Sequence, residues 1–204
     1  MNYSRALLSL FMIAGVFASF VAGQSPTDPD SAAMKNVQAA ISAAAQPGPE
    51  HERLASLAGE WQQEVKVWME PGSEPVILPG VCINKMILGG RFLQLTAESE
   101  FMGEKTESIN IIGFDRRHKA YTLVGFDTWG TYYVTASGSY DDSTKTITMS
   151  GEDYDPIAGI TQKYDMTLQF MDENKFVMAV ILKEETQTKV GDSFQLAKIT
   201  FTRQ

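Results

Sequence analysis

Apolar and polar residues alternate along most of the chain beyond Gly59. The alternation is clearest in four stretches, at residues 64–69, 93–98, 146–150 and 163–170. A period of two places apolar side chains on one face of a β-strand and polar side chains on the other. The pattern therefore predicts strands with one buried face and one wet face.

Turn-forming residues interrupt this region at short intervals, as at Pro71-Gly72, Gly89-Gly90 and Asp141-Asp142-Ser143. They predict about ten strands that are joined mostly by hairpins. No helical pattern of crossover length lies between them, which excludes a parallel sheet. The predicted fold is all-β, an antiparallel up-and-down β-barrel, because closure removes exposed strand edges. A two-sheet β-sandwich is the alternative.

Two helices are expected before the strands. Residues 30–46 are rich in Ala, with Met34, Val37 and Ile41 three and four positions apart, which predicts a helix with a narrow apolar stripe. This helix is interpreted as a loosely docked arm, and a partner-binding helix is the alternative. A second, short helix is predicted over residues 49–57, where it would lie across one end of the barrel as a plug.

The amino terminus has the pattern of a secretory signal peptide. A short cationic start over residues 1–5 precedes an uncharged apolar run over residues 6–21, and small residues follow. Cleavage is expected before Gln24, and an uncleaved membrane anchor is the alternative. The protein is therefore expected to be exported, to the periplasm or the outside of the cell, with no membrane contact after cleavage.

These patterns divide the chain into a signal peptide (1–23), an Ala-rich arm or linker (24–48) and a β-barrel domain (49–204). The formal net charge is −8, so no nucleic-acid partner is expected, because phosphate binding needs clustered Lys and Arg. The single cysteine, Cys82, permits no intramolecular disulfide. It is interpreted as a small buried hydrophobe, since no His lies near it in the sequence.

The motif Gly59-Glu60-Trp61, with Arg203 at the end of the last predicted strand, resembles the Gly-x-Trp signature of lipocalins and other calycins. In those barrels the Trp packs across the base beneath an Arg from the final strand. A Trp face attracts a guanidinium, and the guanidinium can also hydrogen-bond the helix-to-strand turn. The resemblance implies a structural role for both residues.

A closer resemblance covers most of the predicted barrel domain. The blocks His51…Leu54…Leu57 to Trp61, Leu88 to Leu93, Gly113-Phe114-Asp115 and Gly138 to Asp141 resemble domain of unknown function 1579, a largely bacterial family without an established activity. The resemblance implies a lipocalin-like barrel and supplies no reaction.

Asp127 is the carboxylate of most chemical interest. It shares strand parity with Tyr121, Leu123 and Gly125, which would place it inside the barrel mouth, where burial would raise its pKa and suit it to acid/base chemistry. The favoured interpretation is that Asp127 instead caps the turn that it opens.

Arg91 either reaches into the barrel toward an acidic head group or is solvated beside its Gly-Gly turn. Aromatic residues of the middle strands either line a pocket for a flat or apolar ligand or fill the core. The candidate ligand-binding residues are Arg91, Tyr121, Asp127, Trp129, Tyr133 and Tyr164. No catalytic residue, cofactor or metal site is predicted, since His51 and His118 have no ligand-spaced partners.

Three functions remain open. The leading hypothesis is a barrel that binds a small apolar or amphipathic ligand in its interior. The second is an enzyme acting on a lipid-like substrate, with Asp127 and either Tyr133 or Arg91 transferring protons. The third is a protein-interaction module that uses the amino-terminal arm. The sequence makes no prediction about oligomeric state.

Overall fold

The computed structural model describes residues 29–155, 159–183 and 193–204, so the predicted signal segment lies outside the described residues. The chain divides into two compact units, residues 1–41 and 42–204. The helices and strands in chain order are α1 (Pro29–Ala45), α2 (Pro49–Ala55), β1 (Gly59–Val67), β2 (Val76–Ile87), β3 (Phe92–Phe101), β4 (Glu104–Asp115), β5 (Ala120–Asp127), β6 (Val134–Asp141), β7 (Thr146–Asp155), β8 (Ile160–Asp172), β9 (Lys175–Lys183) and β10 (Phe194–Arg203).

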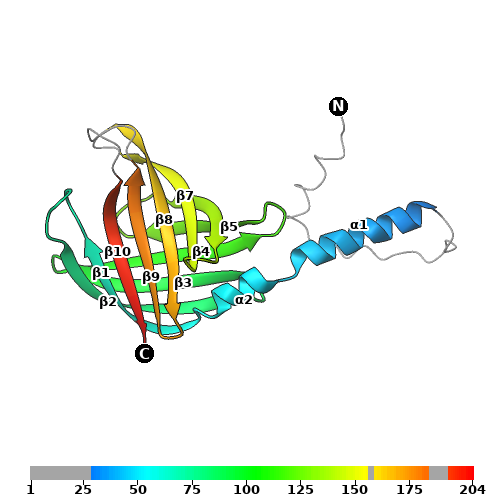
Figure 1. Cartoon of the computed structure of the whole chain (residues 1–204), viewed down its shortest axis with the longest axis horizontal. Coiled ribbons are helices and arrows are strands. Elements are labelled where there is room, and N and C mark those ends of the chain that lie inside the picture. The colour runs from blue at the N-terminus through cyan, green and yellow to red at the C-terminus, as the bar shows by residue number, and fades with distance from the viewer. Residues whose placement is uncertain (1–28, 156–158, 184–192) are drawn as a thin grey trace. The chain divides into compact units, whose positions relative to one another are not determined.

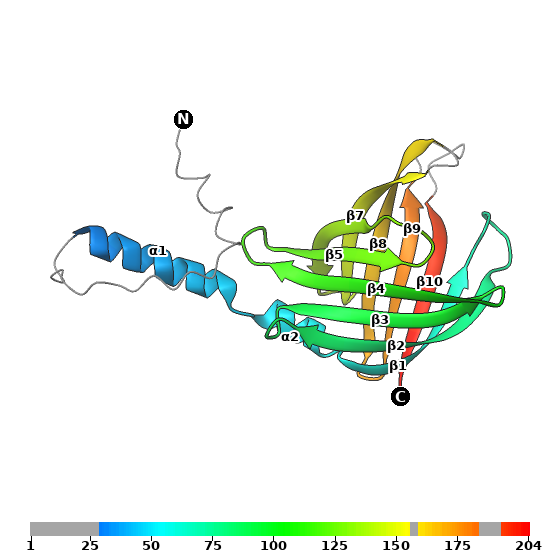
Figure 2. The ribbon, with the colours of Figure 1, turned by 180° about the vertical axis from the view of Figure 1, so that it is seen from behind.

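The ten strands form a closed barrel in which each strand pairs antiparallel with its neighbours in the chain (Figure 1). The last strand, β10, pairs with β1 over seven positions, from Trp61 opposite Arg203 to Val67 opposite Ala197. Figure 2 shows β2, β3 and β4 side by side across one wall. The prediction of an up-and-down barrel is confirmed, and the sandwich alternative is wrong because the pairing has no break.

The alternation of the sequence matches the two faces of the barrel wall. On β8, Tyr164, Met166 and Leu168 are buried, whereas Lys163, which precedes Tyr164 and faces the opposite side of the strand, is exposed. The same alternation on the other strands defines an inward face, and the inward residues form one hydrophobic core. Burial of these apolar side chains is the main stabilising contribution to the fold.

The two predicted helices are present with nearly the predicted bounds. In α1 the predicted apolar stripe is exposed, at Met34, Val37 and Ile41. In α2, Leu54 is fully buried and joins the barrel core, so this helix plugs one end of the barrel, called here the α2 end. No helix among the described residues is long and apolar enough to cross a membrane.

The α2 end is sealed by the residues that the Gly-x-Trp resemblance singled out. The Arg203 guanidinium carbon lies 4.2 Å from the ring centroid of Trp61. The same guanidinium donates hydrogen bonds of 2.9 Å to the carbonyl oxygens of Ser56, Ala58 and Glu173. It therefore joins the last strand to the end of α2, where carbonyl groups have no partners within the helix.

Gly59 makes this arrangement possible at the start of β1. Its φ is +136°, a conformation that residues with a Cβ rarely adopt. A Cβ at this position would also lie 2.6 Å from an Arg203 nitrogen. The Trp61 indole N–H completes the closure by donating to the Leu57 carbonyl at 3.0 Å.

Buried polar groups at the α2 end are paired with one another. Asn84 donates to the Leu57 carbonyl at 2.9 Å and accepts a hydrogen bond from the Cys82 thiol at 3.1 Å. Burial raises the pKa of Cys82 to about 12, so this thiol is not a nucleophile at neutral pH. Arg53, from α2, donates to the Tyr121 hydroxyl and lies 3.7 Å from the Tyr140 ring centroid.

Replacing Arg203 tests the closure of the barrel. Arg203→Lys retains the charge but cannot make three hydrogen bonds in a fork while stacking on Trp61, so we expect the free energy of unfolding to fall by about 2 kcal/mol. The measurement is urea denaturation. Arg117→Lys, at an exposed turn, is the control and should change stability by less than about 0.5 kcal/mol. An equal effect of both changes would contradict the structural role of Arg203.

His51 should make stability depend on pH. Its Nδ1 accepts the Gly48 N–H at 3.0 Å, and burial holds its pKa below 6.5, with Arg116 and Arg91 acting in the same direction and Glu50 opposing them. Because the unfolded chain binds this proton more readily, stability is greatest above pH 6.5 and falls as the pH drops below that value.

His51→Gln keeps an acceptor for the Gly48 N–H and removes the titration. We expect denaturation midpoints measured on either side of pH 6.5 to differ less for this variant than for the unaltered protein. His118 is exposed, and its Nδ1 lies 2.8 Å from the Asp115 carboxylate, so His118→Gln serves as the comparison. A pH dependence that survives in His51→Gln would exclude His51 as its source.

Candidate functional site

The structure places Asp127 at an exposed turn. It ends β5, and its carboxylate accepts the backbone N–H of Trp129 at 2.9 Å. Asp127 therefore caps the turn, which is the interpretation that the sequence favoured. Acid/base chemistry would need a buried carboxylate with a polar neighbour, and this position does not provide that environment.

Arg91 also has a structural position, in the β2–β3 connection at the α2 end. Its side chain donates to the Ala45 carbonyl at 3.0 Å and to the Leu88 carbonyl at 3.1 Å. Arg116, from the β4–β5 connection, binds the carbonyl groups of Ala43 and Gln46 in the same way. The two cations thus pair with carbonyls around the carboxyl end of α1. The helix dipole stabilises positive charge at this end of a helix.

The four aromatic candidates lie in different parts of the barrel. Tyr121 is fully buried at the α2 end, where its hydroxyl accepts the Arg53 hydrogen bond. Trp129 and Tyr133 lie on the β5–β6 connection and are more than half exposed. Tyr164 is 5% exposed and faces inward on β8. Of the six predicted residues, only Tyr164 therefore faces the interior away from the α2 end.

Inward residues are packed less completely as the distance from α2 increases. The exposed fraction is 0% for Leu93 and Ile147 and 1% for Trp61, which lie toward the α2 end. It rises to 8% for Leu78 and 9% for Ala97, farther along β2 and β3. The half of the barrel nearest α2 is therefore packed completely, and inward residues of the other half, called here the far half, are slightly more exposed, with Val134, Val180 and Ile199 only partly buried.

Three inward glycines in the far half are covered by polar side chains from the adjacent strand. A Cβ on Gly80 would lie 2.7 Å from the Gln63 amide, and one on Gly125 would lie 2.7 Å from the Asn110 amide oxygen. A Cβ on Gly151 would lie 2.7 Å from the Tyr164 hydroxyl. Gln63, Asn110 and Tyr164 thus lie over the glycine backbone of the adjacent strand.

The two amides have unused hydrogen-bonding capacity. Gln63 is 7% exposed, and its single hydrogen bond within the described chain is a long one, 3.5 Å from its Nε2 to the Glu98 carbonyl. The Asn110 side chain is half-buried and makes no hydrogen bond to any described residue. Buried amides normally find partners, so these two are candidates to bind a ligand or water.

Tyr164 completes this inward set, called here the far-half site: Gln63, Asn110 and Tyr164. Its hydroxyl donates to the Thr135 carbonyl at 2.9 Å and keeps lone pairs to accept a further hydrogen bond. Burial raises the pKa of Tyr164, and the nearby negative charge of Asp153 raises it further. The hydroxyl is therefore protonated at neutral pH and acts as a hydrogen-bonding group.

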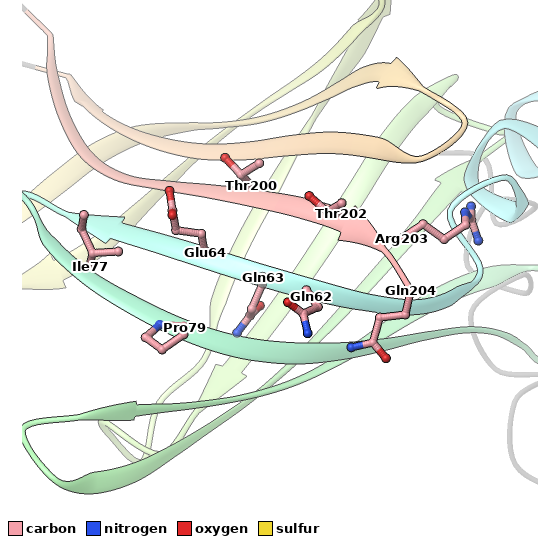
Figure 3. Close-up of a pocket in the computed structure, with 9 residues that line it drawn as sticks. All are labelled: Gln62, Gln63, Glu64, Ile77, Pro79, Thr200, Thr202, Arg203 and Gln204. Atoms are coloured by element: carbon pink, nitrogen blue, oxygen red, sulfur yellow. The ribbon is translucent and has the colours of Figure 1, made fainter.

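A separate hollow of about 590 Å³ lies against β1, β2 and β10. Figure 3 shows its lining side chains along these strands. Gln62 and Glu64 alternate with the inward Trp61 and Gln63, so they lie on the outer face of the wall. Glu64 pairs with Lys66 at 3.2 Å. This hollow is an open groove on the outside of the barrel, and Gln63, which is 7% exposed, is also among its lining residues.

Gln63 and Asn110 were not among the residues predicted from the sequence. The sequence does contain a signal, because each is a polar residue on the same strand face as a core residue two positions away. Gln63 shares its face with Trp61 on β1, and Asn110 shares its face with Ile112 on β4. Reading the signal requires knowledge of which face of each strand points inward.

The fold and this interior define a closed, ten-stranded up-and-down barrel with a helical plug and a polar far-half site. A family model described as "Protein of unknown function (DUF1579)" matches residues 46–203, so the chain belongs to this family. No curated protein matches the sequence. The crystal structure of Rv2717c from M. tuberculosis is similar, with a TM-score of 0.54 and 14% identity, covering 78% of this chain and 99% of that chain. At this identity the likeness supports the fold alone.

Gln63→Met tests whether the Gln63 amide lacks partners. Methionine has a similar shape and no strong hydrogen-bonding group, so we expect the free energy of unfolding to rise by about 1 kcal/mol. Gln62→Met, at the next position on the outer face, is the control and should lie within about 0.5 kcal/mol of the unaltered protein. A loss of stability in Gln63→Met would mean that the amide is well satisfied. Urea denaturation measures both.

Proposed function

We propose that the protein binds a small amphipathic molecule inside the barrel, in the far half, and that it does so after export from the cytoplasm. The observation that carries the proposal is the pairing of three inward glycines with Gln63, Asn110 and Tyr164. This arrangement holds the three polar groups over the glycine backbone of the wall. Export is supported by the cationic, apolar and small-residue order of residues 1–23.

The apolar surroundings suit such a ligand. Leu78, Ala97 and Ala136 are buried on the inward face, and Val180 and Ile199 pack partly buried beside them. Ligand pockets in proteins are mostly apolar, with a few polar groups that orient the ligand. An alkyl or ring portion would contact these residues, and its polar end would bind the far-half site.

An enzymatic role has less support. Asp127 caps an exposed turn, and the hydroxyl of Tyr164 already donates to the Thr135 carbonyl. Neither group is arranged to transfer a proton to a bound molecule. Binding therefore accounts for the interior residues better than the acid/base alternative.

Filling the lumen tests the location of the ligand. Ala136→Leu adds three carbon atoms on the inward face, so we expect the affinity for N-phenylnaphthylamine, a neutral apolar dye, to fall at least about tenfold. Ser137→Leu adds similar bulk at the next position, which is exposed on the outer face, and should bind the dye normally. Fluorescence titration measures the affinity.

The folded state of both variants is checked by circular dichroism, and Ala97→Val provides a milder filling change if Ala136→Leu unfolds. Native mass spectrometry of protein from its own host should show a retained small molecule that is lost from Ala136→Leu. Equal dye binding by the filled and unaltered proteins would show that the interior is not the site.

A further inference from the structure

Charged residues are sorted between the two faces of the barrel wall. The lysines of the strands lie on the outer face, where three of them pair with acids: Lys66 with Glu64, Lys105 with Glu98 and Glu107, and Lys183 with Asp165. Their nitrogen–oxygen distances range from 2.6 to 3.2 Å. These cations are therefore held away from the lumen.

The inward arginines of the described chain belong to the α2 end. Arg203 stacks on Trp61 and donates to three carbonyl groups, and Arg53 is bound to Tyr121 and Tyr140. Both guanidinium groups are thus committed to closing the barrel. On the described strands, no lysine or arginine takes an inward position in the far half.

The far half contains an inward carboxylate instead. Asp153, on β7, shares its strand face with the buried Ile147 and Met149, and it is half-buried between the exposed Glu152 and Tyr154. One of its oxygens accepts the Tyr154 backbone N–H at 2.9 Å, and no described cation pairs with it. Strand register places it beside the far-half site, because Gly151, two residues earlier on the same face, pairs with Tyr164.

We infer that the far-half site selects cationic over neutral amphiphiles and excludes anionic ones, such as fatty acids. The inference rests on the proposed function and names its ligand class. A carboxylate ligand would bring a second negative charge near Asp153, with no inward cation on the described strands of the far half to compensate it. An ammonium group would be attracted to Asp153 and would donate a hydrogen bond to the Tyr164 hydroxyl oxygen.

Three ligands with the same alkyl chain test this inference: decylammonium, decanol and decanoate. Each is titrated, below its micelle concentration at neutral pH, against the full-length protein loaded with N-phenylnaphthylamine. We expect decylammonium to displace the dye at about one tenth of the decanol concentration, and decanoate to need at least about ten times more than decanol.

Asp153→Asn should abolish the difference between decylammonium and decanol while leaving decanol binding unchanged. Asparagine keeps the oxygen that accepts the Tyr154 N–H, so the local backbone should persist. Glu152→Gln is the matched control, because it makes the same change in net charge on the outer face of the same strand. It should retain the preference, and a preference lost equally in both variants would be a general effect of the acidic surface.

The outcomes separate this inference from the proposed function. If decanol binds and decanoate binds as tightly as decylammonium, the charge selection is wrong and interior binding stands. If none of the three displaces the dye and Ala136→Leu has no effect on it, the proposed function fails and the inference fails with it. The expected order, lost only in Asp153→Asn, supports both.

Discussion

The guanidinium of Arg203 is the interaction on which the rest of the barrel depends. It joins the last strand to Trp61 on the first strand and to carbonyl groups at the end of α2. Without this link, the seam between β1 and β10 would end beside unpaired helix carbonyls. The closure therefore fixes both the pairing of β1 with β10 and the position of α2 at the end of the barrel.

Closure at one end determines how completely each half of the barrel interior is packed. Trp61, Leu54 and Phe176 fill the α2 end, and Trp61 packs edge-on against Phe176 with ring centroids 4.7 Å apart. Such a core gains stability from complete packing and leaves no room for another molecule. The far half is packed less completely, and the amides of Gln63 and Asn110 keep unused hydrogen-bonding capacity. Residues that weaken a fold in this way are commonly retained for function.

Much of the fold was predictable because it depends on local patterns. Alternation predicted the strands, turn residues predicted the hairpins, and Gly59 to Trp61 with Arg203 predicted the closure. The direction of β5 was not predictable, because Val124 and Phe126 make its outer face nearly as apolar as its inner face. That ambiguity is why Asp127 had two interpretations. The role of Arg91 depends on a carbonyl 46 residues away along the chain, which periodicity cannot identify.

The far-half site was beyond prediction for a related reason. Gln63 and Asn110 matter only because glycines stand opposite them, and the pairs Gln63–Gly80 and Asn110–Gly125 depend on strand register. The same register decides that lysines face out and Asp153 faces in. A one-residue slip in a strand that carries lysine, such as β4 with Lys105, would exchange its faces and place a cation in the lumen. The charge of the interior is thus a consequence of register, so the register that closes the barrel beneath Arg203 also sets which charged groups face the far half.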